Sequence, residues 1–250
     1  MPDAPRLLSP PDVPAVRYAK NFIKTAVCEL RFPTLLELEA KPPHAFQKLI
    51  RKAYPTYEAQ VVDMGSGEEA LKENRYLFRS MDTHWIVSVK SFALSLETSK
   101  YLAFEDFFDR LMVVLRSAEQ FIDADFYTRL GLRYINKIPI QDGDPNEWVN
   151  SELLAPANSN VLGTLSKYAC VLIGSLENGN YAMRHGFGEE SKAAEGSKPE
   201  YTLDVDYYCE NLAAAAVAER VKEFNRMNFK LFTWCLGPKA RAMLGEGKPK

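Results

Sequence analysis

Apolar and polar residues alternate along several segments of the chain, and each of these segments predicts a strand. A period of two places alternate side chains on opposite faces, so the apolar set marks the buried face. Residues 62–75, which contain Gly65-Ser66-Gly67, predict a flexible loop. The predicted strands are 24–33, 76–81, 85–91, 92–100, 127–138, 165–176, 180–187 and 201–208.

Other segments repeat apolar residues at the spacing of a helix. They predict helices over 44–53, 103–122 and 211–236, and a short helix after Asp144-Pro145. Gly237-Pro238 is a stop signal for the last long helix. Residues 188–199 are poor in apolar residues, and we expect them to be mobile.

Two short motifs occur twice. Residues 28–32 (CELRF) are echoed by 130–134 (LGLRY), and residues 92–97 (FALSLE) by 201–206 (YTLDVD). The offsets are similar, since 133 − 31 is 102 and 206 − 97 is 109. We therefore predict an α+β fold of pseudo-duplicated β-α-β-β-β-α units, which form a largely antiparallel sheet with long helices on one face. The element order resembles the duplicated, saddle-like fold of TATA-binding-protein relatives.

The predicted organisation has four parts: a Pro-rich N-terminal arm (1–20), a first α+β repeat (21–123), a second repeat (124–240) and a flexible tail (241–250). Five prolines exclude a regular helix from the arm. Two interpretations of the arm remain open, a disordered tail and an extended segment that lies across a partner or a second subunit.

The repeated strands place charged residues on the face opposite their apolar side chains. Arg31 is expected to pair with Glu97 there, and Arg133 with Asp206. Two interpretations compete: ion pairs that organise the sheet face, and a groove whose arginines bind phosphate or carboxylate groups. The candidate binding residues on this face are Arg31, Arg79, Lys90, Glu97, Arg133, Asp204 and Asp206.

Catalytic signals are weak. Glu97, Asp204 and Asp206 together suit a divalent cation, and His84 in a turn suits a general base, but a solvated strand face and a polar turn explain them equally well. The sequence lacks phosphate-binding loops, HExxH and GxSxG. We therefore predict no catalytic residue, no metal site and no cofactor.

Composition narrows the class of protein. The chain has 250 residues, 46% of them hydrophobic, and a formal net charge of −2, which gives no long-range attraction to nucleic acid or anionic membrane. We expect a cytoplasmic protein, because no apolar run reaches the roughly 18–20 residues that span a bilayer and the N-terminus lacks the apolar core of a signal peptide. The four cysteines are scattered and are expected to be buried thiols.

Several stretches resemble a known family: 76–80 (YLFRS), 85–89 (WIVSV), 96–101 (LETSKY) and 131–136 (GLRYIN). They are similar to sporadically distributed, uncharacterised bacterial proteins of about this length, over roughly residues 20–240. That family implies no established activity. Its patchy distribution implies accessory roles in mobile elements or anti-phage defence.

The leading hypothesis is a non-enzymatic binding or accessory module that engages a protein or ribonucleoprotein partner through the sheet face and the termini. Direct contact with nucleic acid and homodimerisation stay open, the latter because strand edges must be covered or paired. The alternative is a metal-dependent enzyme that acts on a nucleotide or nucleic acid through Glu97, Asp204 or Asp206.

Overall fold

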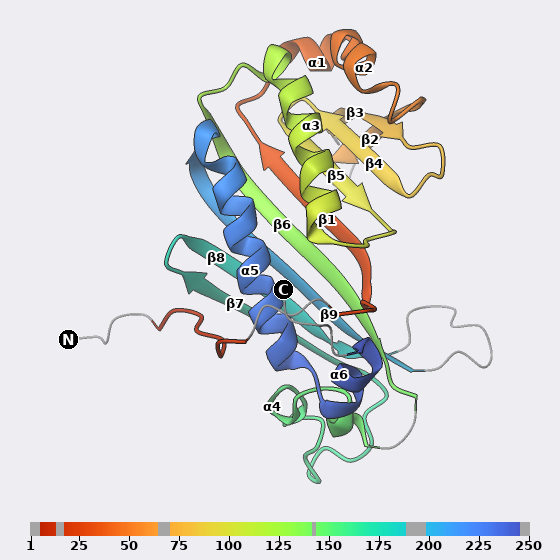
Figure 1. Cartoon of the computed structure of the whole chain (residues 1–250), viewed down its shortest axis with the longest axis vertical. Coiled ribbons are helices and arrows are strands. Elements are labelled where there is room, and N and C mark those ends of the chain that lie inside the picture. Colours follow the sequence, from red (N-terminus) through yellow and green to blue (C-terminus); the bar gives the residue numbers. More distant parts are fainter. Residues whose placement is uncertain (1–5, 14–17, 65–70, 142–143, 189–198, 246–250) are drawn as a thin grey trace. The chain divides into compact units, whose positions relative to one another are not determined.

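A computed structural model describes residues 6–13, 18–64, 71–141, 144–188 and 199–245 (Figure 1). It is a mixed α+β structure built on a nine-stranded antiparallel sheet. The strand order is β2-β3-β4-β5-β1-β6-β9-β8-β7. The strands are β1 (Ile23–Arg31), β2 (Thr56–Met64), β3 (Leu71–Arg79), β4 (Trp85–Lys90), β5 (Ala93–Thr98), β6 (Phe126–Pro139), β7 (Tyr168–Leu176), β8 (Gly179–Phe187) and β9 (Glu200–Ala213).

The helices lie between and after these strands. Two of them are long, α3 and α5. The start of α3 is close to the expected residue 103, but α5 begins at Val217 and not near 211, because residues 211–213 still belong to β9 and 214–216 form the short helix η2. The helices are α1 (Leu36–Ala40), α2 (His44–Ile50), α3 (Phe104–Ile122), η1 (Pro145–Glu147), α4 (Ser151–Leu154), η2 (Ala214–Ala216), α5 (Val217–Cys235) and α6 (Pro238–Leu244). No described helix is both long enough and apolar enough to cross a membrane.

The prediction of a flexible loop over 62–75 was wrong at both ends. Residues 62–64 complete β2 and residues 71–75 begin β3, and the two strands pair from Thr56↔Arg79 to Met64↔Leu71. Tyr57, Ala59 and Val61 alternate with polar neighbours, which is the pattern of a strand. The adjacent Gly-rich run nevertheless led to the prediction of a loop. Residues 65–70 lie outside the described residues.

The C-terminal prediction also needs correction. The helix stop at Gly237-Pro238 ends α5, but Pro238 then begins α6, because proline suits the first turn of a helix. Ala240 and Leu244 are fully buried, so residues 241–244 belong to the folded structure. Most of the segment expected to be mobile, residues 189–198, lies outside the described residues.

The described residues form two compact units, and their boundary does not follow the expected repeats. One unit comprises 25–133 and 208–222; the other comprises 1–24, 134–207 and 223–250. We call them the α3 unit and the α6 unit. The division passes through β1, β6, β9 and α5, so these four elements contribute residues to both units.

The core of the α3 unit lies between α3 and its strands (Figure 1). Leu30, Leu94 and Leu96 are at most 1% exposed on the strands. The apolar stripe of α3 is buried against the sheet because its residues recur at helical spacing. The buried residues of α3 are Phe107, Leu111, Val114, Leu115, Ala118 and Ile122.

The core of the α6 unit contains buried tyrosines that bond to α5. Tyr207 stacks on Phe224 with 6.1 Å between the ring centroids, and its hydroxyl donates to the Met227 carbonyl at 3.4 Å. The Tyr134 hydroxyl donates to Asn225 Oδ1 at 3.0 Å. These bonds satisfy phenol groups that burial would otherwise leave without partners.

The described part of the N-terminal arm lies on its own chain, in the α6 unit. The Leu8 N–H donates to the Ser175 carbonyl of β7 at 2.9 Å, and the Asp12 carboxylate pairs with Lys230 of α5. Whether the arm also contacts a partner stays a prediction.

Candidate binding surfaces

The polar face of the α3 unit carries several of the residues expected to bind a partner. Arg31 lies at the end of β1, where its Nε is 2.8 Å from Glu29 Oε1. The β1–β5 register places Ala93 opposite Arg31, and Glu97 opposite Val27. The expected Arg31–Glu97 ion pair was therefore wrong, because antiparallel pairing separates the two residues by four positions along the strands.

The second expected pair stays a prediction. Arg133 belongs to the α3 unit and Asp206 to the α6 unit. Asp204, two residues before Asp206, is 6% exposed, and its Oδ2 is 4.0 Å from Arg184 Nη1.

Two other predicted cations are paired across neighbouring strands. Arg79 Nη2 lies 3.4 Å from Glu58 Oε2, and Lys90 Nζ lies 2.8 Å from Glu73 Oε2. The Lys90 ammonium is also 5.4 Å from the centroid of the Phe92 ring. Each of these cations thus already has a carboxylate partner, which fits the interpretation of ion pairs that organise the sheet face.

Arg129 of β6 was missed by the sequence reasoning. Its guanidinium lies 4.9 Å from the centroid of the Tyr208 ring, and its Nη1 is 3.6 Å from Glu29 Oε1. A Cβ at Gly131 would come within 2.4 Å of Arg129 Nη1, so the glycine leaves room for the guanidinium. The repeat contained a signal for this arrangement. Gly131 stands at the position where the first copy has Glu29, so the second copy lacks a side chain there and leaves space for a neighbouring one.

The described residues do not support the metal-site hypothesis. No group of three or more His, Cys, Asp or Glu side chains among them is placed to hold a metal ion. His84 Nδ1 lies 3.0 Å from Ser99 Oγ, and the Asp82 carboxylate accepts from the Ser80 hydroxyl at 2.6 Å. This bond lowers the pKa of Asp82. The turn thus has an internal hydrogen-bond network of the kind that stabilises hairpins.

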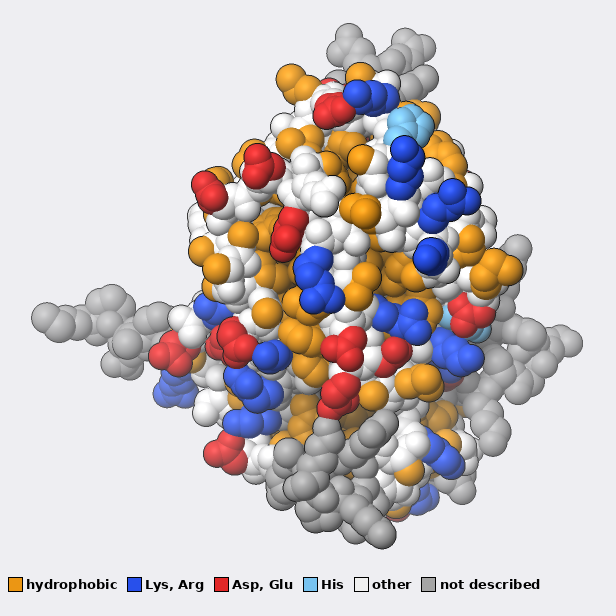
Figure 2. All heavy atoms as spheres, turned by 45° about the horizontal axis from the view of Figure 1, so that its top comes forward, with side chains coloured by type: hydrophobic (Ala, Val, Ile, Leu, Met, Phe, Trp, Pro, Cys, Tyr) orange, Lys and Arg blue, Asp and Glu red, His pale blue; other side chains and the backbone are white. Residues whose placement is uncertain are grey.

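A small basic group lies on α2 and the turn that follows it. Lys48, Arg51 and Lys52 are all exposed. Figure 2 shows Lys and Arg side chains gathered beside a His side chain over α2, whereas charges of both signs are interspersed on the rest of this face. The near-neutral total charge therefore includes a local positive patch.

Strand β7 forms one edge of the sheet and is unusual in its exposed side chains. Val171, Leu172 and Ile173 are 58%, 40% and 73% exposed. The strand, YACVLIGSL, contains no charged residue and no proline. Natural edge strands commonly carry such residues, because they prevent pairing with another chain. The opposite edge strand, β2, contains both Glu58 and Asp63.

A buried pair of titratable groups lies in the α6 unit. His185 is 5% exposed, and its Nδ1 is 2.6 Å from the Tyr201 hydroxyl. Burial lowers the pKa of His185 and raises the pKa of Tyr201. Both groups are neutral near pH 7 for this reason. Among the cysteines, Cys28, Cys209 and Cys235 are buried as expected, but Cys170 of β7 is partly exposed.

Comparison with protein-family models and with curated proteins found no match to this chain.

Proposed function

We propose that this protein is a non-enzymatic binding module that holds an extended segment of a partner protein against the free edge of β7. The observation that carries the proposal is the exposed apolar sequence of that edge. Three consecutive apolar residues, Val171, Leu172 and Ile173, stand in solvent on a strand that has no charge to repel another chain. Strand addition of this kind combines main-chain hydrogen bonds with side-chain contacts.

The arm of the chain supports this use of the edge. The Ser175 carbonyl accepts the Leu8 N–H, so it points away from β8. In an antiparallel strand the N–H and C=O of one residue point to the same side, and this side alternates along the strand. Ala169, Val171 and Ile173 therefore present their backbone groups to the same side as Ser175, the side away from β8. An added strand would pair there, next to the arm.

The test is capture of partners by the tagged protein from its own host, with and without nuclease. The double variant Val171→Lys/Ile173→Lys places charges on the edge without a buried substitution, and such surface changes usually alter stability by only about 0.5 kcal/mol. Val61→Lys is the matched control, since Val61 is 63% exposed on the opposite edge strand. We expect a stoichiometric protein that survives nuclease, is retained by Val61→Lys and is lost by the double variant.

Three results would overturn the proposal. The first is a partner that the double variant captures as well as the wild type. The second is a partner lost with nuclease, which would move the interaction to nucleic acid and the basic group on α2. The third is a wild-type dimer in sedimentation that the double variant dissociates, because the edge would then serve a second copy.

Two further parts of the sequence hypothesis are retained in the proposal. One is an internal duplication with long helices on one face. Its support is the strand order, in which β3-β4-β5-β1 is followed by β6-β9-β8-β7. If β1, β5, β4 and β3 correspond to β6, β9, β8 and β7, the second half of the sheet contains the corresponding strands in the reverse order. The other is a role in bacterial defence or a mobile element, which the identity of the captured partner would test.

A further inference from the structure

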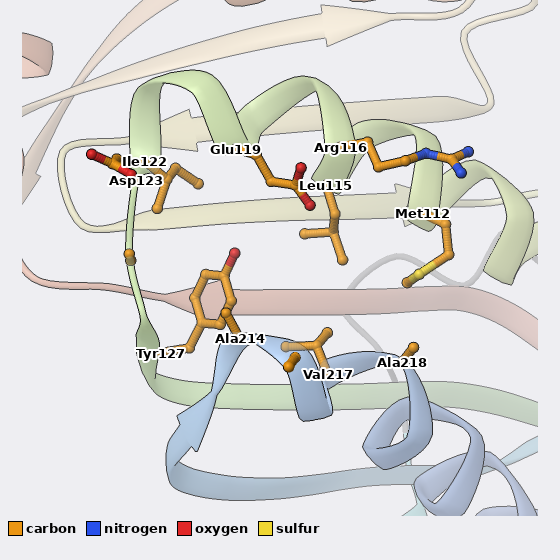
Figure 3. Close-up of a pocket in the computed structure, with 12 residues that line it drawn as sticks. Met112, Leu115, Arg116, Glu119, Ile122, Asp123, Tyr127, Ala214, Val217 and Ala218 are labelled. Carbon is orange, nitrogen blue, oxygen red and sulfur yellow. The ribbon is translucent and has the colours of Figure 1, made fainter.

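A cavity of about 430 Å³ lies within the α3 unit, between the end of α3, the start of β6 and the start of α5 (Figure 3). Its size falls within the roughly 300–1,000 Å³ of small-molecule sites. The Ala214 N–H donates to the Asp125 carbonyl at 2.9 Å and so ties η2 to the segment before β6. The polar contributors are Arg116, Glu119 and Asp123 of α3 and its C-cap, and Tyr127 of β6.

The floor of the cavity is apolar. Leu115 and Ile122 of α3 and Val217 of α5 line it, and these side chains are 8%, 5% and 4% exposed. Met112, Ala214 and Ala218 extend the same surface. A ligand would therefore gain most of its binding free energy from burial of an apolar body.

Tyr127 places a polar group on this floor. The side chain is 6% exposed, and Figure 3 shows its hydroxyl pointing into the cavity. Burial and the charge of Glu119 raise the pKa of Tyr127, so the phenol keeps its proton and can both donate and accept.

Glu119 supplies the charge that acts on this hydroxyl. Its side chain descends from α3 toward the cavity in Figure 3, whereas Arg116 and Asp123 lie toward the two ends. Glu119 itself is exposed, so its carboxylate is hydrated and ready to exchange water for a ligand group. The cavity thus combines an apolar floor, a phenol and a carboxylate at its mouth.

We propose that this cavity binds a small amphipathic organic cation. An ammonium group would donate to the Glu119 carboxylate and the Tyr127 hydroxyl, and a short apolar body would lie against Leu115, Ile122 and Val217. The cavity and the β7 edge share no residue. A negative result for one proposal therefore does not affect the other.

The probe is 2-phenylethylamine, titrated against methyl-labelled protein while the NMR signals of Ala214 and Ala218 are followed. We expect saturable millimolar binding, and no saturable binding of 3-phenylpropionate, which has a similar body and the opposite charge. Glu119→Gln should weaken the amine about fivefold, the effect of a partly exposed ion pair. Asp109→Asn, which removes one exposed charge from the same helix outside the cavity, should leave the affinity unchanged.

A second variant tests the location. Ala218→Trp should fill the cavity and abolish the shifts, provided that circular dichroism and the unfolding midpoint show an intact fold. Absence of saturable shifts in the wild type would overturn the proposal. Equal binding of the propionate, equal affinity in Glu119→Gln, or binding that survives in a folded Ala218→Trp variant would overturn it as well.

Discussion

The surroundings of a side chain in this protein affect its ionisation, and the histidines illustrate this. His84 lies in a turn and His44 is exposed on α2, whereas His185 is enclosed in the α6 unit against Tyr201. Burial lowers the pKa of His185, because it disfavours the charged imidazolium.

This burial predicts a pH dependence of stability. The folded-state pKa of His185 lies below its ordinary value of 6.5, so the unfolded state binds a proton at higher pH than the folded state does. The free energy of unfolding should therefore fall as the pH is lowered through about 6.5, until the folded-state pKa is reached. Urea unfolding at pH 7.5, 6.5 and 5.5 measures this change in the free energy of unfolding. The change should be absent in His185→Gln and present in His44→Gln. If the free energy of unfolding varied with pH equally in His185→Gln and the wild type, the assignment to His185 would be contradicted.

At the scale of elements, apolar periodicity identified the long helices well. The expected helix over 103–122 is α3, Phe104–Ile122, and its stripe is the buried face. Strand β2 was missed, although Tyr57, Ala59 and Val61 alternate with polar residues in this nine-residue strand, because the adjacent Gly65-Ser66-Gly67 run favoured a loop. Strand alternation correctly placed Arg31 on the face opposite the buried Leu30, but it did not give the partner of Arg31, since alternation gives the face of a residue and not the register between strands.

The burial of α3 predicts a contrast between two of its residues. Leu111 is 1% exposed, so Leu111→Ala should lower the free energy of unfolding by about 2–5 kcal/mol, through lost burial and the cavity left behind. Val113 is 46% exposed on the same helix, and Val113→Ala should change it by less than about 0.5 kcal/mol. Denaturant unfolding of both variants checks this, and equal losses would mean that α3 does not pack as described.

On the scale of the whole molecule, four elements (β1, β6, β9 and α5) each contribute residues to both compact units, so the two units share parts of the same strands and of the same helix. We expect one cooperative unfolding transition for this reason. The proposed duplication adds a comparison between Leu94 in β5 and Leu203 in β9, which occupy equivalent positions of the repeated motif and are 1% and 0% exposed.

Leu94→Ala and Leu203→Ala should each lower the free energy of unfolding by about 2–5 kcal/mol, and the two losses should agree within about 1 kcal/mol. Calorimetry should show a single transition that both variants shift to lower temperature. Two transitions, each sensitive to one variant, would show that the units unfold separately and would remove the expectation of shared cooperativity.

The amino-acid sequence determined the α+β class, the antiparallel character of the sheet, the long helices and the buried faces, because the local periods of apolar residues carry that information. The repeated motifs also located β1, β5, β6 and β9. Tertiary structure alone decided the partners of Arg31 and Arg129, the exposed edge at Val171–Ile173 and the cavity around Tyr127. These features depend on register, strand order and the approach of segments distant in sequence, and no local pattern of residues encodes them.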